Sequence, residues 1–153
     1  AYQMTSILEG AIQRGTGKRL KDLNLQLASK TGTTNNNTDT WFIGFTSNLV
    51  VGVYVGYDSP KRLGKYETGS KTALPIFKDF IKKAVNNYEA RPFKIAKGIK
   101  MMFIDEETGE KADFGSKKTI IESYKKEKFE NQTFISNDKY KSDIYKKNIL
   151  KFY

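Results

Sequence analysis

Two apolar runs with a two-residue gap between them constrain the fold of this chain more than any other feature. Residues 41–46 and 49–57 are rich in aromatic and β-branched side chains, and a serine and an asparagine separate them. This pattern is typical of a β-hairpin with a short loop. In the second run valines alternate with residues that include Gly52 and Gly56, so one face of that strand is nearly bare. We expect a helix to pack against the bare face.

Amphipathic helices are predicted on both sides of this hairpin. Apolar residues recur at helical spacing over residues 4–12, near the start of the chain. A second stripe covers residues 75–85 and has a proline in its first turn. Together with an extended segment at 25–34, the pattern predicts an α+β fold. Both helices should cover the same face of a three-stranded antiparallel sheet, the face that carries Gly52 and Gly56.

The chain divides into three parts. Residues 1–88 hold all of the elements above. Residues 89–112 form an extension in which alternating apolar residues, followed by a turn at 106–109, predict a short hairpin. Residues 113–153 are rich in lysine and show no clear periodicity, so we expect a weakly ordered tail.

Composition excludes several classes of function. The 153 residues contain no cysteine and no histidine, so thiolate and imidazole chemistry is absent and we expect no metal site and no cofactor. The formal net charge of +10 comes mostly from lysine, whereas base recognition relies on arginine, so we expect no nucleic acid partner. No apolar run approaches the roughly 20 residues that span a bilayer. The segment that starts at Ala1 lacks the features of a signal peptide, and we interpret it as the point where a longer protein has been cut.

The most informative stretch is the end of the first extended segment. Lys30 supplies a positive charge there. The hydroxyls of Thr31 and Thr33 share one face, and Gly32 between them removes a side chain that would hold a ligand backbone away. Such a strand suits an extended peptide that ends in a carboxylate and adds to the sheet as a further strand.

These residues resemble a known signature. The run Lys30-Thr31-Gly32-Thr33-Thr34 is similar to the third signature of penicillin-binding proteins and serine β-lactamases. Further residues follow as in the transpeptidase domain of class A penicillin-binding proteins: Asp39, Trp41, Phe42, Gly44, Pro60, Leu63, Gly64, Glu67, Thr68, Gly69, Pro75, Ile76 and Phe77. The resemblance covers residues 1–110. It implies the C-terminal part of such a domain, a truncated form of the serine β-lactamase and penicillin-binding transpeptidase fold.

The resemblance implies a role for each residue of the signature. Lys30 would help to move protons during acylation and deacylation. Thr31 and Thr33 would present hydroxyls to the terminal carboxylate of a peptidoglycan stem peptide or of a β-lactam. The backbone N–H of Thr33 would be one of two donors to the carbonyl oxygen of the tetrahedral intermediate. Gly32 would keep the strand approachable, and Thr34 would line the substrate strand or support its loop.

The resemblance also shows what is missing. The reaction needs a nucleophilic serine with a lysine three residues later, ahead of the signature, and no such pair precedes Lys30. The spacings Ser123–Lys126 and Ser136–Lys139 lie behind it, at the frequency expected by chance. We therefore expect a fragment that depends on the missing N-terminal part of the same protein and is inactive alone.

The implied function of the parent protein is peptidoglycan cross-linking. It would combine a glycosyltransferase with a D,D-transpeptidase that acts on D-Ala-D-Ala and is acylated by β-lactams. It would work in the bacterial cell envelope, on the outer, periplasmic face of the inner membrane, and meet the membrane only through an absent anchor. Three other interpretations stay open: a non-catalytic module that binds carboxylates, a basic domain that binds an anionic polymer, and a fragment of a β-lactamase.

Overall fold

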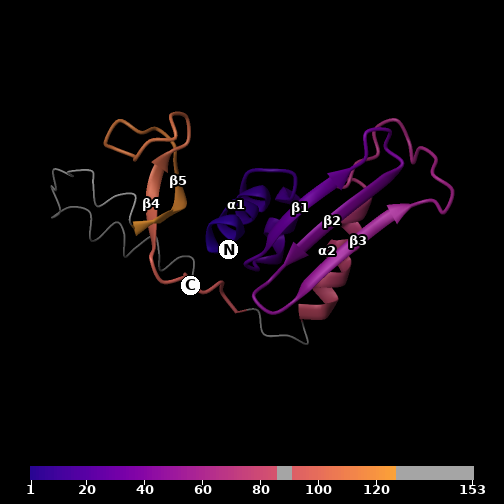
Figure 1. Cartoon of the computed structure of the whole chain (residues 1–153), viewed down its shortest axis with the longest axis horizontal. Helices are drawn as coiled ribbons and strands as arrows, with labels where there is room; N and C mark the ends of the chain where they lie inside the picture. Colours follow the sequence, from indigo (N-terminus) through magenta and orange to yellow (C-terminus); the bar gives the residue numbers. More distant parts are fainter. Residues whose placement is uncertain (86–90, 127–153) are drawn as a thin grey trace.

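The computed structural model describes residues 1–85 and 91–126, which form a three-stranded sheet with helices on one face and a separate two-stranded hairpin (Figure 1). The elements in chain order are α1 (Tyr2–Gln13), the 3₁₀ helix η1 (Lys18–Leu23), β1 (Ala28–Thr33), β2 (Asp39–Phe45), β3 (Val50–Gly56), α2 (Ala73–Ala84), β4 (Ile99–Asp105) and β5 (Thr119–Lys125). The predicted α+β class is confirmed.

The predicted hairpin forms, and its first strand lies at the centre of the sheet. β2 pairs antiparallel with β3, with Phe45 opposite Val50. The Thr46 N–H donates to the Leu49 carbonyl oxygen at 2.9 Å and closes the short loop. β1 pairs antiparallel with the other side of β2, so the strand order is β1-β2-β3. β1 is therefore an edge strand of the described sheet.

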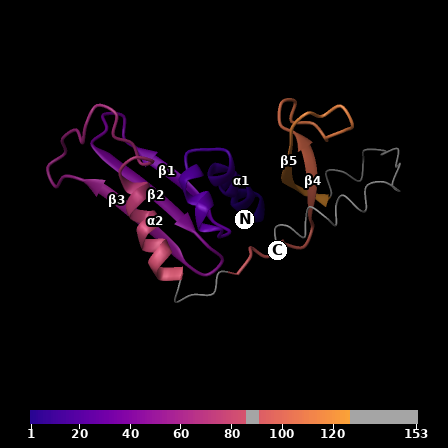
Figure 2. The ribbon, with the colours of Figure 1, turned by 180° about the vertical axis from the view of Figure 1, so that it is seen from behind.

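The two α-helices bury one face of this sheet. Phe42 of β2 and Phe77 of α2 are fully buried, with their ring centroids 4.8 Å apart. The rest of the core consists of Ile12, Leu20, Leu27, Ala73, Leu74 and Ile81. Each large apolar side chain buried in this way contributes roughly 1.5–3 kcal/mol. Both helices cover the same face, as predicted, and Figure 2 shows α2 lying across the sheet.

The covered face is the opposite of the one predicted from the glycines. Val51, Val53 and Val55 of β3 pack against the core, whereas Gly52 lies opposite Ile43 on the uncovered face. Close approach to a helix falls instead on Gly44 of β2, since a Cβ there would lie 2.6 Å from Phe77 Cζ. The prediction was wrong because burial of three valines outweighs close packing on two glycines, so the strand turns its row of valines to the core.

Helix α1 is present, but its buried side is rotated from the predicted stripe. Met4 is exposed, whereas Ser6 is buried. Glu9 is half-buried, and it accepts a hydrogen bond of 2.6 Å from the Gln26 amide nitrogen. The Gln26 amide oxygen in turn accepts from the Phe93 N–H at 2.8 Å. These hydrogen bonds allow the Glu9 carboxyl group to face inward. The spacing of apolar residues does not predict this orientation.

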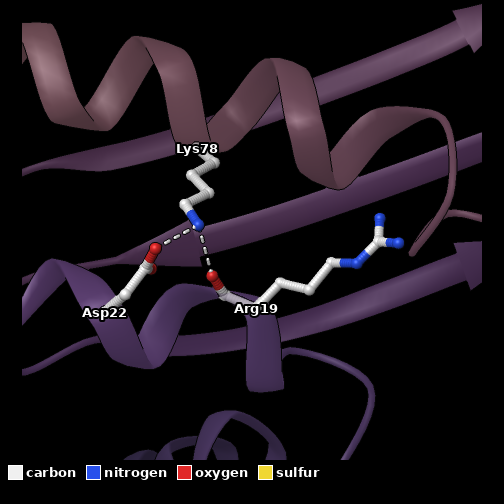
Figure 3. A network of polar contacts seen from close by, with 3 residues as sticks. All are labelled: Arg19, Asp22 and Lys78. Atoms are coloured by element: carbon white, nitrogen blue, oxygen red, sulfur yellow. Dashed lines mark hydrogen bonds and ion pairs between the residues drawn. The ribbon is translucent and has the colours of Figure 1, made fainter.

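A polar contact joins η1 to α2. Lys78 Nζ donates to the Arg19 carbonyl oxygen at 2.7 Å and to Asp22 Oδ2 at 2.6 Å (Figure 3). The hydrogen bond from Lys78 lowers the pKa of the Asp22 carboxyl. Because Asp22 lies at the surface, the contact sets the position of η1 more than it adds stability.

Strands β4 and β5 form a second antiparallel hairpin, with Phe103 opposite Ile121. The predicted turn at 106–109 is present, and the predicted short hairpin forms as an antiparallel bridge from Ile104 to Lys111, next to a hydrogen bond of 2.9 Å from the Ala112 N–H to the Phe103 carbonyl oxygen. The main partner strand of β4 lies at 119–125, in the segment predicted to be a weakly ordered tail. That prediction was wrong for residues 119–125, because these residues pair with β4 and cover the partly buried apolar side chains of that strand. The tail residues 127–153 and the boundary at residue 88 lie outside the described residues.

The second hairpin lies beside α1 (Figure 1). The Gln3 amide donates to the Ser123 carbonyl oxygen at 3.0 Å, and Arg14 forms an ion pair of 2.9 Å with Glu122. The first helix and the last described strand are therefore in direct contact. No helix within residues 1–85 and 91–126 is long and apolar enough to cross a membrane.

Replacing Gly44 with alanine is expected to destabilise the chain, because the new Cβ would press on the buried ring of Phe77. Overpacking of this kind costs about 1–3 kcal/mol. Gly52→Ala is the matched control, since its Cβ would meet only Ile43 Cγ1, at 3.8 Å. Urea denaturation of both variants measures the difference. Equal losses would contradict the assignment of the covered face.

Glu9→Gln is expected to change how stability depends on pH. Burial raises the pKa of Glu9 above its ordinary value of 4.5, and the hydrogen bond from Gln26 opposes this only in part. The folded state therefore holds this proton more tightly than the unfolded chain does. The resulting stabilisation is complete below pH 4.5 and is lost as the pH rises through the raised pKa.

The variant has no proton to lose, so its unfolding free energy relative to the parent should increase between about pH 4 and pH 7. Urea denaturation at both pH values measures this change. Glu107→Gln, which replaces an exposed carboxyl group, serves as the control. The same pH dependence in the Glu9 variant and in the parent would contradict the burial of the carboxyl group.

Candidate functional site

The residues predicted to act on a ligand lie on β1, with Thr34 directly after it, and the outer edge of β1 carries no strand in the described part of the chain. The Thr34 N–H donates to the Asp39 carbonyl oxygen at 3.1 Å, which continues the β1–β2 ladder. Backbone N–H groups point alternately to the two sides of a strand, so those of Thr31 and Thr33 point to the free edge. These two donors are available to a ligand that adds to the sheet.

The side chains of β1 alternate between two faces and separate the lysine from the hydroxyls. Lys30 is exposed on the face away from the helices, and its Nζ donates to the Thr31 carbonyl oxygen at 3.0 Å. Thr31 and Thr33 share the helix-covered face, where Thr33 Oγ1 accepts from the Gly69 N–H at 3.1 Å. A ligand must lie along the edge itself to reach both the lysine and the hydroxyls.

Two glycines allow tight backbone packing behind this strand. A Cβ on Gly69 would lie 2.3 Å from the Trp41 carbonyl oxygen and 2.8 Å from the Gly32 carbonyl oxygen. A Cβ on Gly32 would lie 3.2 Å from Trp41 Cβ. The loop that leads into α2 is anchored further by a hydrogen bond of 2.6 Å between the hydroxyls of Thr40 and Thr72. The strand is thus clamped between its neighbour β2 and this loop.

The hydroxyl of Thr34 closes the turn after β1. Its oxygen accepts from the N–H groups of Thr38 and Asp39 at 3.1 and 3.0 Å. Asp39 also accepts a hydrogen bond of 2.7 Å from the Tyr54 hydroxyl, and this bond raises the pKa of Tyr54. These contacts favour the supporting role for Thr34, and its contact with substrate stays a prediction.

The Ser123–Lys126 spacing does not form a recognisable nucleophile. Ser123 is buried within β5, whereas Lys126 lies just beyond the end of that strand, so the pair does not have the helical spacing of the family's motif. The spacing Ser136–Lys139 lies outside the described residues. Within residues 1–85 and 91–126 no three acidic side chains are grouped so that they could hold a metal ion.

Sequence reasoning assigned no role to Thr16, yet its Oγ1 lies 3.2 Å from the Oγ1 of Thr31. The contact depends on how the chain leaves α1 and crosses β1. The signal that could have found it is the sequence Gly15-Thr16-Gly17, because glycine on both sides allows close approach of a backbone to a strand.

Comparison with known proteins agrees with this fold. Residues 1–82 match the penicillin-binding protein transpeptidase domain. Penicillin-binding protein 1A of Rickettsia conorii is 48% identical over 139 residues, which are 89% of this chain and 17% of that protein. The protein of the same name from Pseudomonas aeruginosa is 41% identical over 128 residues, or 83% of this chain and 16% of that protein. The crystal structure of penicillin-binding protein 1A from Haemophilus influenzae matches with a TM-score of 0.67 and 31% identity, over 77% of this chain and 19% of that one.

The fold is that of a penicillin-binding transpeptidase domain, in truncated form. The chain belongs to the penicillin-binding protein transpeptidase family and is part of a class A penicillin-binding protein. It spans 17% of the length of its Rickettsia conorii relative.

Asp39→Asn is expected to return the pKa of Tyr54 toward its ordinary value of 10.0, because the carboxylate that holds the phenol proton is removed. Ultraviolet titration of tyrosinate measures the pKa, with Tyr54→Phe as the reference that identifies the signal. Asp113→Asn removes an exposed carboxylate elsewhere and should leave the titration unchanged. An unaltered Tyr54 titration in Asp39→Asn would show that the contact is not formed.

Proposed function

We propose that this chain supplies the substrate-binding edge strand of a peptidoglycan D,D-transpeptidase. The observation that carries the proposal is the free edge of β1. There, two outward N–H groups stand between a lysine on one face and two threonine hydroxyls on the other. An extended stem peptide that ends in D-Ala-D-Ala would add to this edge as a further strand. Membership of the penicillin-binding family supports this choice of ligand.

Each residue of the edge has a separate task in this proposal. The hydroxyls of Thr31 and Thr33 donate charge-assisted hydrogen bonds to the terminal carboxylate of the peptide or of a β-lactam. The Thr33 N–H stabilises the oxyanion of the tetrahedral intermediate, and loss of one such donor typically costs about 3–4 kcal/mol in the barrier. Lys30 helps to move protons between nucleophile and leaving group. Gly32 leaves room for the peptide backbone.

The nucleophilic serine is proposed to lie outside this chain, in a preceding part of the same protein. Its oxygen forms a bond to the carbonyl carbon of the penultimate D-alanine, and the terminal D-alanine leaves with a proton. An amine of a neighbouring stem peptide then takes the acyl group, and the serine regains its proton. A β-lactam stops the reaction at the acyl stage. Because the nucleophilic serine lies outside it, the chain alone would be inactive.

The uncovered face of the sheet is proposed to pack against that preceding part. Trp41, Ile43 and Tyr54 gather there, with 43, 46 and 49% of their surface exposed. The rings of Trp41 and Tyr54 are 5.0 Å apart, so they form one apolar patch. A patch of this kind marks an interface.

The wider setting is part of the same proposal. Residues 1–88 belong to the transpeptidase domain, and the hairpin of β4 and β5 belongs to an extension that follows it. The parent carries a glycosyltransferase as well, and it acts in the cell envelope on the periplasmic face of the inner membrane.

Lys30→Ala in the full-length protein is expected to slow acylation by benzylpenicillin by roughly a hundredfold or more, the usual contribution of a proton-transfer group. Single-turnover kinetics with intact-mass detection measure the rate. Lys100→Ala is the matched control, since it also removes an exposed lysine from a strand. Unchanged acylation in Lys30→Ala would refute the proposed function.

The same mass measurement locates the nucleophile. This chain incubated alone with benzylpenicillin should gain no adduct, whereas the segment that precedes it should gain one when the two are mixed. An adduct on the isolated chain would place a nucleophile within it and overturn that part of the proposal.

A further inference from the structure

The end of α1 crosses β1 at the residues of the signature. The N–H groups of Gly15 and Gly17 both donate to the Ala11 carbonyl oxygen, at 3.1 and 3.0 Å, and turn the chain sharply. A Cβ on Gly17 would lie 3.1 Å from Ser29 Oγ, so this segment rests directly on the strand. Thr16, between the glycines, is thereby brought to 3.2 Å from the hydroxyl of Thr31.

We propose that Thr16 is a positioning residue, whose hydroxyl donates to Thr31 Oγ1 and so directs the Thr31 proton to the carboxylate of the ligand. This inference rests on the proposed function, in which Thr31 binds that carboxylate. Thr16 acts through Thr31 and touches neither the ligand nor the reacting atoms.

The direction of the hydrogen bond follows from what each group can do. Either hydroxyl is able to donate in the free protein. An ionised carboxylate only accepts hydrogen bonds, so Thr31 must donate its single proton to a bound carboxylate. The contact between the two threonines then persists only with Thr16 as the donor. Donation to Thr31 also polarises its O–H group and strengthens the bond to the ligand.

The fold does not depend on this hydroxyl. Thr16 is exposed, and backbone hydrogen bonds of the neighbouring glycines already hold the turn. Removal of the Thr16 hydroxyl should therefore alter ligand binding without loss of structure.

The test uses the full-length protein and two ligands, benzylpenicillin and its uncharged methyl ester. Thr16→Val keeps the shape of the side chain without the hydroxyl, and it should lower the acylation efficiency for the acid by about two- to tenfold, the usual worth of one hydrogen bond. The efficiency for the ester should fall by less, because its uncharged carbonyl oxygen accepts a weaker hydrogen bond than the carboxylate does. Thr16→Ser restores the hydroxyl and should recover the efficiency for the acid. Thr119→Val, an exposed β-branched control on β5, should change neither.

A double-mutant cycle with Thr31→Val separates the possible outcomes. If Thr16 acts through Thr31, Thr16→Val should have no further effect in the Thr31→Val background. Equal losses for acid and ester in Thr16→Val would show a merely structural role and overturn the inference. If Thr31→Val lowers the acid-to-ester ratio and Thr16→Val does not, the inference fails and the proposed function stands. If Thr31→Val leaves that ratio unchanged, the proposed role of Thr31 itself fails.

Discussion

The contact between Phe42 and Phe77 decides which way every side chain of the sheet points. Neighbouring residues of a strand face opposite sides, so burial of Phe42 under α2 fixes the faces of β2 and, through their pairing, those of β1. Lys30 must then lie on the uncovered face, and the hydroxyls of Thr31 and Thr33 on the covered one. A slip of one residue in this pairing would exchange the lysine with the hydroxyls, so a core contact sets the chemistry of the edge.

The edge strand is held by parts of the chain that are far apart in sequence, and each part reaches it through a small residue. Gly17 brings the end of α1 against Ser29, and Gly69 brings the loop before α2 against Gly32. The turn closed by Thr34 fixes the far end of the strand. Backbone donors fixed in this way need no rearrangement when charge develops on a ligand, which is the condition for strong transition-state stabilisation.

Local patterns predicted the parts of this structure that local forces decide. The hairpin around residues 47–48 and the helix that starts at Ala73 follow from alternation and helical spacing. The glycines of β3 and the apolar stripe of α1 predicted the wrong buried face for each element. The choice of buried face depends on Phe77 and Gln26, which lie elsewhere in the sequence. The pairing of β5 with β4 and the contact of Thr16 with Thr31 also arise from the crossing of distant segments. The roles of Lys30 and the threonines came from resemblance to a family, since the residues alone suggested only a carboxylate-binding strand.

The contacts between α1 and β5 join residues 120 positions apart, Gln3 and Ser123. A ribosome makes a protein from its N-terminal side, so α1 and the three-stranded sheet emerge before β5 exists. Contacts within the sheet span short loops and close early, whereas contacts over such a separation carry a larger loop-closure cost. The outer side of α1 therefore stays uncovered until synthesis has passed Lys125. During that interval the Gln3 amide and the Arg14 guanidinium lack the carbonyl oxygen and the carboxylate that they contact in the folded chain.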